Sequence, residues 1–192
     1  KPTEVRSLIE ESLTESAFVK LLLVQRALPV LEEMAAVLVR TLKRGRSVWF
    51  FGNGGSAADA QHLAAELEGR FLKNRRALPA AALTANTSTL TAIGNDFGYE
   101  CVFERQVEAH VRRGDAVVAI STSGNSPNVL AGVDRARRLG AVTLGFTNEK
   151  GGKLKGRADL CLCVPSTDTQ RVQECHIAAG HVLCDVIERS LF

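Results

Sequence analysis

His62 and Glu66 lie four residues apart in the stretch VWFFGNGGSAADAQHLAAELEGRF, which begins at Val48. If the chain is helical after the glycines, the two side chains project from one helix face about one turn apart. An imidazole and a carboxylate at that spacing can share a ligand, bind a metal ion or transfer a proton. Taken singly, each has a plainer interpretation, as a structural histidine and a solvated surface glutamate.

The C-terminal segment DTQRVQECHIAAGHVLCDVIE adds three polar candidates, Gln173, His176 and His181. Gln173 and His181 are eight residues apart, which is a rise of roughly 12 Å in a helix. Both side chains would have to stretch to reach one ion. The spacing alone therefore does not define a metal site.

Two loops, 52–56 (GNGGS) and 121–126 (STSGNS), each follow an apolar run and precede a helical pattern. The glycines of the first loop allow a tight turn that exposes backbone N–H groups. Four of the six residues in the second loop carry hydroxyls, and Pro127 follows in the first helical turn. Hydroxyls and helix N-terminal N–H groups favour a phosphate monoester, whereas the plain alternative is a pair of tight strand-to-helix turns.

Dinucleotide binding is a competing interpretation, because Gly52, Gly54 and Ala57 match the G-x-G-x-x-A fingerprint after a strand. That fingerprint also expects an acidic residue at the end of the next strand, where this chain has Thr84 followed by Ala85. Neither loop carries the G-K-[ST] lysine of a nucleoside triphosphate site. The sequence therefore disfavours a nucleotide ligand.

Short apolar runs alternate with segments of helical period, which predicts an α/β fold with one doubly wound parallel sheet. The predicted strands are 47–51, 79–84, 116–121, 141–147 and 159–164. The helices between them are predicted at 56–71, 87–93, 100–112 and 127–139. Further amphipathic helices at 2–23, 28–42 and 172–191 exceed what one sheet needs. They predict packing against another copy of the chain, unless they cover the sheet of their own chain.

The composition fits one globular domain, since 45% of the 192 residues are hydrophobic and 23% are charged. The formal net charge of +3 is small and its basic residues are scattered, which argues against nucleic acid. No apolar run reaches the roughly 18 to 20 residues of a membrane span, and no signal-peptide layout opens the chain. The odd count of five cysteines predicts reduced, mostly buried thiols. A soluble cytoplasmic protein is expected.

Four blocks together carry a family resemblance: GNGGSAADAQHLAAELEGRF, AIGNDFGYE, AISTSGNSPNV and STDTQRVQECH with His181 after it. In order and spacing they resemble the phosphoheptose isomerases, or sedoheptulose 7-phosphate isomerases, of the sugar isomerase (SIS) domain superfamily. The resemblance runs from about Leu28 to the end of the chain. Each block occurs more widely in SIS domains, but the four in register are specific to this family.

The resemblance implies a flavodoxin-like five-stranded parallel sheet and a single SIS domain over residues 1–192. Residues 1–45 would form helices used in packing and oligomerisation, and residues 46–192 the parallel core and the C-terminal helix. It also implies a homotetramer whose active sites draw on neighbouring subunits, with one zinc ion per subunit. Its metal ligands fall on His62, Glu66, Gln173 and His181. Its substrate contacts fall on Asn53, Gly54, Gly55, Glu66, Asn95, Asp96, Ser121, Thr122, Ser123, Ser126 and Gln173.

The implied reaction converts sedoheptulose 7-phosphate, a phosphorylated seven-carbon sugar, to D-glycero-D-manno-heptose 7-phosphate through an enediol. Glu66 and His181 match the acid/base pair of the family. The resemblance assigns no lysine or arginine of the four motifs to the phosphate. Hydroxyls and N–H groups would therefore hold the phosphate. The alternative is a non-catalytic phosphosugar-binding SIS module of the kind that associates with a replication initiator. Such modules typically lack Glu66, His181 or both, and this chain has them.

Overall fold

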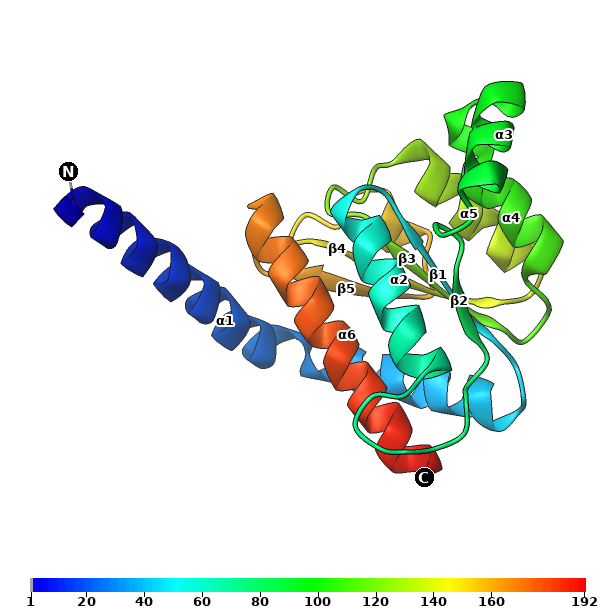
Figure 1. Cartoon of the computed structure of the whole chain (residues 1–192), viewed down its shortest axis with the longest axis horizontal. Helices are drawn as coiled ribbons and strands as arrows, with labels where there is room; N and C mark the ends of the chain where they lie inside the picture. The colour runs from blue at the N-terminus through cyan, green and yellow to red at the C-terminus, as the bar shows by residue number, and fades with distance from the viewer. Residues whose placement is uncertain (1) are drawn as a thin grey trace.

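Five parallel strands form the centre of the computed structural model, which describes residues 2–192 (Figure 1). Within those residues the strands lie in the order β2-β1-β3-β4-β5. Their bounds are β1 Val48–Gly52, β2 Ala80–Ala82, β3 Ala116–Ile120, β4 Val142–Asn148 and β5 Leu160–Val164. This is the flavodoxin-like order, so the predicted doubly wound sheet is confirmed. The direction of winding reverses between β1 and β3.

Helices cover both faces of the sheet, because its strands alternate large apolar side chains between the two sides. Phe50, Val118 and Phe146 face the layer of α1, α2 and α6, whereas Phe51 and Val117 face α4 and α5. Figure 1 shows α2 and α6 side by side across one face, with α3 to α5 on the other side of the sheet. The helix bounds are α1 Pro2–Lys43, α2 Gly55–Glu68, α3 Thr87–Phe97, α4 Val102–His110, α5 Pro127–Arg138 and α6 Thr169–Leu191.

The predicted elements differ from the structure mainly at their ends. The second strand is shorter than predicted, and α3 continues past residue 93 to Phe97. Asn86 begins α3 as its N-cap, because its side-chain oxygen accepts a hydrogen bond from the Thr89 N–H at 3.0 Å. The extension places Asn95 and Asp96 on the last turn of a helix.

The two predicted N-terminal helices are wrong as separate elements, because α1 is continuous through Pro29. The proline removes one backbone N–H and leaves the carbonyl of Gln25 without its usual donor. A single buried stripe nevertheless passes through it, with Val19, Leu23 and Ala27 before the proline and Met34 after it. Since residues on both sides of the proline pack against the same face of the domain, the helix is retained. Figure 1 shows its N-terminal part projecting away from the sheet.

None of the helices in residues 2–192 combines the length and the apolar character that a bilayer crossing needs. The cysteines at positions 101, 161, 163, 175 and 184 are free thiols. Cys175 and Cys184 are buried, but the other three are only half-buried. The predicted burial of most of the thiols is wrong, since it holds for two of the five.

His176 is a structural histidine, fully buried on α6 with Nε2 at 3.2 Å from the Thr147 carbonyl oxygen, to which it donates. Its Nδ1 is buried and has no partner among the described residues. Burial lowers the pKa of His176 from 6.5 to about 4, although the hydrogen bond to Thr147 opposes the shift. A second ring proton would thus be placed in an apolar interior without an acceptor.

We expect the free energy of unfolding to fall as the pH drops from about 6.5 towards 4. In this range His176 is protonated in the unfolded chain but stays neutral in the folded protein. Between pH 7 and pH 4.5 this residue alone should remove roughly 2 to 3 kcal/mol. Urea unfolding of the wild type and of His176→Gln at both pH values measures this. The substitution should flatten the pH dependence by that amount, and an equal slope in the two proteins would contradict the assignment.

Candidate functional site

The two predicted ligand loops emerge side by side at the point where the sheet reverses direction. β1 and β3 are paired in register, with Gly52 opposite Ile120, so the loops that follow begin at the same edge. A Cβ on Gly52 would lie 2.7 Å from the Ile120 carbonyl oxygen, which explains the glycine at this position. The carboxyl ends of parallel strands at such a reversal are where ligands bind in this class of sheet.

The glycine turn holds Asn53 in a fixed orientation. Gly54, with φ of 55° and ψ of −120°, is the N-cap of α2 and has a conformation that favours glycine. Asn53 exchanges two side-chain hydrogen bonds of 2.9 Å with Asn128, and its Oδ1 also accepts from the Tyr99 hydroxyl at 3.2 Å. Asn128 is buried at the start of α5. The amide pair therefore ties the glycine turn to the loop that precedes α5.

The hydroxyl-rich loop 121–126 lies directly before the N-terminus of α5. The Ser121 and Ser126 hydroxyl oxygens are 3.1 Å apart. Ser126 is the N-cap of α5, but its side chain makes no cap hydrogen bond. Gly124 has φ of 66° and packs against the backbone of Gly151, which leaves no room for a Cβ. This arrangement supplies hydroxyls together with a helix N-terminus, as a phosphate group requires.

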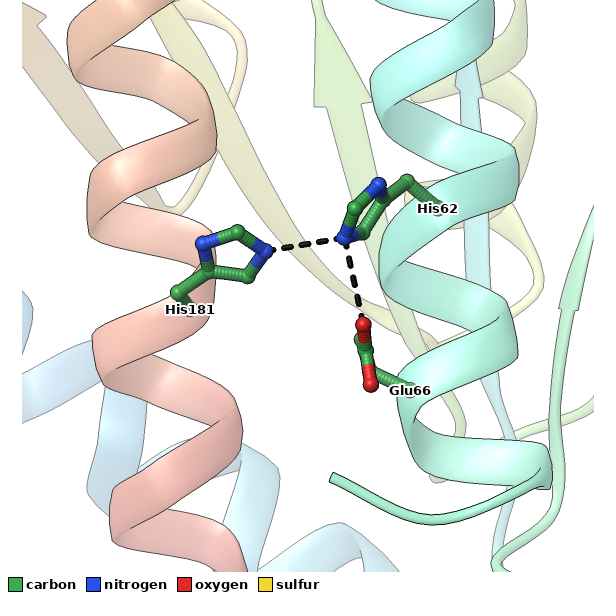
Figure 2. Close-up of side chains that lie close together, drawn as sticks. All are labelled: His62, Glu66 and His181. Carbon is green, nitrogen blue, oxygen red and sulfur yellow. Dashed lines mark hydrogen bonds and ion pairs between the residues drawn. The ribbon is translucent and has the colours of Figure 1, made fainter. Parts of the chain in front are cut away.

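Figure 2 shows His62, Glu66 and His181 converging from α2 and α6. Nε2 of His62 lies 3.1 Å from Oε1 of Glu66 and 2.9 Å from Nε2 of His181. One ligand atom from each residue falls within 4.8 Å of the others. The side chain of Glu66 is 25% exposed and that of His62 is 48% exposed, so the group lies open to solvent.

Gly180 sets how closely α2 and α6 approach at this group. A Cβ on Gly180 would lie 2.5 and 2.6 Å from the two terminal methyl carbons of Leu63. Leu63 follows His62 and Gly180 precedes His181. The absence of a side chain on Gly180 therefore allows the backbones to approach beside the two histidines, and their rings can meet.

Gln173 lies two turns before His181 on the same helix, against the glycine turn. Its Nε2 is 2.5 Å from the position that a Cβ on Gly55 would occupy. Gly55 thus provides space for the Gln173 amide beside the start of α2. Participation of Gln173 in a metal site remains a prediction.

Asn95 and Asp96 form the exposed end of α3, where Asn95 Nδ2 donates to Asp96 Oδ1 at 2.8 Å. Among residues 2–192, these two side chains are hydrogen-bonded only to each other. Asp96 also lines a hollow of about 290 Å³ between α3 and α4, together with Arg105. Their contact with substrate stays a prediction.

Asp59 is an additional acidic residue near the histidines, three positions before His62 on α2. Burial raises the pKa of Asp59, and the nearby His62 partly counteracts this. Its Oδ2 is buried and has no hydrogen-bond partner among the residues described. The residue therefore adds a desolvated carboxyl beside the group.

The donor set of this group fits a divalent metal ion. Two imidazole nitrogens and one carboxylate oxygen, each within 4.8 Å of the others, form a mixed N/O set that zinc accepts. The group is partly open to solvent, which leaves room for a further ligand. The structure thus contains a possible His/Glu metal-binding group.

Three residues that shape the site were not identified from the sequence. Asn128 orients Asn53, Gly180 permits the approach of the helices, and Phe71 stacks on the His181 ring with centroids 5.6 Å apart. Of these three, only Gly180 could have been noticed in the sequence, because it directly precedes His181 in a predicted helix. Glycine inside a helix lowers its stability and usually indicates a packing requirement. Asn128 and Phe71 gave no such signal, because an asparagine in a first helical turn and an aromatic after a helix are both common.

Comparison with known proteins places these features in a family. Residues 19–148 match the SIS domain family. The chain is 53% identical over 180 residues to the phosphoheptose isomerase of Aquifex aeolicus, with 94% of each chain covered. It is 56% identical to the phosphoheptose isomerase of Rhodospirillum rubrum, over 85% of this chain and 87% of that protein.

Solved structures agree with the sequence relatives. The phosphoheptose isomerase of Neisseria gonorrhoeae superposes with a TM-score of 0.92 at 39% identity, covering 96% of this chain and 99% of that one. The corresponding protein of Francisella tularensis gives a TM-score of 0.92 at 34% identity, covering 95% and 97%. The match therefore extends over nearly all of each chain, and this chain belongs to the phosphoheptose isomerase family of SIS-domain proteins.

Proposed function

We propose that the protein interconverts sedoheptulose 7-phosphate and D-glycero-D-manno-heptose 7-phosphate. The observation that carries the proposal is the convergence of Glu66 with His62 and His181 within 4.8 Å. A carboxylate and imidazoles so arranged are suited to moving protons on a bound substrate. The identity to named phosphoheptose isomerases over most of the chain supports this reaction over a non-catalytic binding role.

The reaction moves a proton between the first two carbons of the sugar, while a proton is exchanged between their oxygens. In the proposal Glu66 removes the carbon proton and returns it to the neighbouring carbon. His181 serves the oxygens as the partner acid. Nε2 of His62 carries at most one proton, so its 3.1 Å contact with the Glu66 carboxylate and its 2.9 Å contact with Nε2 of His181 cannot both use that proton fully.

His62, Glu66, Gln173 and His181 would hold the zinc ion in this proposal. Zinc, when bound, supplies a Lewis acid that polarises the carbonyl group. Glu66 cannot act as a tight ligand and a free base at the same moment. In the proposal Glu66 would serve as a ligand in the resting site and as the base during proton transfer.

The remaining predicted contacts would hold the two ends of the sugar. Hydroxyls of the serine loop and the N-terminus of α5 would bind the phosphate without a lysine or arginine from the four motifs. Asn53, fixed by Asn128 and Tyr99, would direct its remaining amide hydrogen towards a sugar hydroxyl. The full proposed set of contacts is Asn53, Gly54, Gly55, Glu66, Asn95, Asp96, Ser121, Thr122, Ser123, Ser126 and Gln173.

Incubation with sedoheptulose 7-phosphate and zinc in deuterated water tests the function directly. The expected result is an aldose phosphate product that carries solvent deuterium at C2. An aldose without label would show that the transferred proton does not exchange with solvent, which direct return of the proton by Glu66 also allows. A folded protein that forms no aldose with added zinc would contradict the isomerase proposal. Tight binding of the sugar phosphate without turnover would instead identify a binding module.

We also propose that residues 1–192 act as one SIS domain that assembles as a homotetramer, with residues 1–45 serving assembly and residues 46–192 forming the core. The projecting part of α1 exposes an apolar stripe, including Leu13, Phe18 and Leu21 at 57 to 66% exposure. The stripe continues through Leu28 into an apolar groove of about 380 Å³ between α1 and α6. A second copy provides the matching apolar surface for so long a stripe. The cytoplasmic location stays a prediction.

Charge placed on this stripe should weaken the assembly. We expect wild-type protein to sediment as a tetramer and Phe18→Glu to sediment as smaller species, because a carboxylate cannot be buried there unpaired. Glu33→Lys is the control, since this exposed residue of α1 lies outside the stripe and should leave the mass unchanged. Sedimentation velocity measures both, and an intact tetramer for Phe18→Glu would remove the stripe from the interface.

A further inference from the structure

We infer that Arg75 and Glu188 are positioning residues: their buried ion pair fixes the segment after α2 so that Phe71 packs against the imidazole of His181. The inference rests on the proposed function insofar as it assigns a catalytic consequence to that packing. The pair is called the Arg75–Glu188 clasp below. It lies outside the predicted catalytic, substrate and metal residues.

Glu188 binds the segment through its backbone. It lies on α6 seven residues after His181, or about two turns along the same face. Its carboxylate accepts hydrogen bonds from the N–H groups of Phe71, Leu72 and Lys73 at 2.8 to 2.9 Å. Three consecutive N–H groups on one carboxylate fix the backbone path of Phe71.

Arg75 completes the clasp and closes the end of α2. Its Nε donates to Glu188 Oε1 at 2.9 Å, and both side chains are 1% exposed. Its Nη2 donates to the carbonyl of Glu66 at 2.7 Å, and its Nη1 to the carbonyl of Leu67 at 2.8 Å. These carbonyls belong to the last turn of α2, where the helix offers no internal donor. The guanidinium therefore holds the turn that carries Glu66.

The clasp acts on the proposed site through Phe71. The Phe71 ring stacks on the His181 ring with centroids 5.6 Å apart and an interplanar angle of 25°. His62 meets the same imidazole at 2.9 Å between nitrogens. His181 is thus held between His62 and Phe71, which limits rotation of its ring. The clasp keeps Phe71 in that position.

Packing alone does not explain why Arg75 and Glu188 are charged residues. A buried ion pair can often be replaced by apolar side chains of similar volume without loss of stability. Burial raises the pKa of Glu188, but hydrogen bonds from Phe71, Lys73 and Leu72 and the charge of Arg75 together lower it below its usual value. The carboxylate is therefore ionised and engaged with the segment. A role in fixing that segment explains why polar groups are used here.

The double variant Arg75→Met, Glu188→Leu tests the inference, because it fills the volume but releases the segment. We expect the ring-current shift that Phe71 imposes on the His181 imidazole protons to be lost in its NMR spectrum. We expect kcat to fall about 10- to 100-fold and KM to change less than about twofold, since the serine loop is untouched. Lys73→Ala, whose side chain is exposed on the same segment, should match wild type in all three measurements.

Phe71 variants show whether the clasp acts through this ring. Phe71→Ala should lower kcat by a similar factor, and adding it to the double variant should cause little further loss. Phe71→Tyr keeps the aromatic face and should restore kcat. If the double variant does not fold, Glu188→Gln keeps the side-chain shape with a weaker acceptor, and the NMR and kinetic readouts then apply to it.

An unchanged ring-current shift in the folded clasp variant would overturn the inference, as would independent, multiplicative losses for the clasp and Phe71. A wild-type protein without isomerase activity would overturn the proposed function instead. The NMR comparison would still decide whether the clasp positions Phe71 against His181.

Discussion

Replacing Glu66 with Gln should lower kcat for heptose phosphate isomerisation by about 10³-fold, because the amide has nearly the same shape but no basic oxygen. Binding of the sugar phosphate should survive within a few-fold, since the serine loop and the glycine turn are unchanged. Steady-state kinetics at saturating zinc measures kcat, and titration calorimetry measures binding. Zinc content must be determined in parallel, because Glu66 is also a proposed metal ligand.

The control for this change is Glu68→Gln, which alters the same chemical group two residues later on the exposed side of α2. It should retain full activity. If Glu66→Gln also turned over at the wild-type rate, the carbon proton would have to be removed by another group. The desolvated carboxyl of Asp59 would then be the next candidate.

Gly180→Ala should lower kcat by about 100-fold, although the substitution adds only one methyl group. The new carbon would meet the terminal carbons of Leu63 at 2.5 to 2.6 Å, so α6 must shift from α2 beside the two histidines. Misplacement of reacting groups by about 1 Å can cost that factor. Alanine favours a helix over glycine by about 1 kcal/mol, and overpacking costs about 1 to 3 kcal/mol. The net loss of folding stability should therefore be about 0 to 2 kcal/mol, which leaves the protein folded in the kinetic assay.

Adding Leu63→Val to the Gly180→Ala variant should recover much of the lost activity, because valine is shorter and relieves the clash with the new methyl group. Gly156→Ala is the matched control, since a Cβ there meets nothing within 4 Å. Kinetics and thermal unfolding of the four proteins separate geometry from stability. Equal kcat in Gly180→Ala and wild type would show that the helix spacing does not determine the chemistry.

The sequence by itself determined the parallel sheet and those parts of the site that depend on local chain geometry. Alternation of apolar runs and helical segments predicted five parallel strands, and the structure confirms them. The spacing of His62 and Glu66 placed them on one helix face, where they lie 3.1 Å apart. The two ligand loops were also predictable, because loops after neighbouring parallel strands meet at the same edge. Local periodicity suffices for each of these features.

Only the tertiary structure decided how α6 meets α2. The sequence gives no distance between His62 and His181, which are 119 positions apart, yet their nitrogens lie 2.9 Å apart. Beside that contact Leu63 packs against Gly180, and Glu188 binds the segment that carries Phe71. The continuity of α1 through Pro29 was likewise decided by packing of the buried stripe on both sides of the proline. Contacts between distant elements depend on the simultaneous fit of many side chains, which no local pattern of residues encodes.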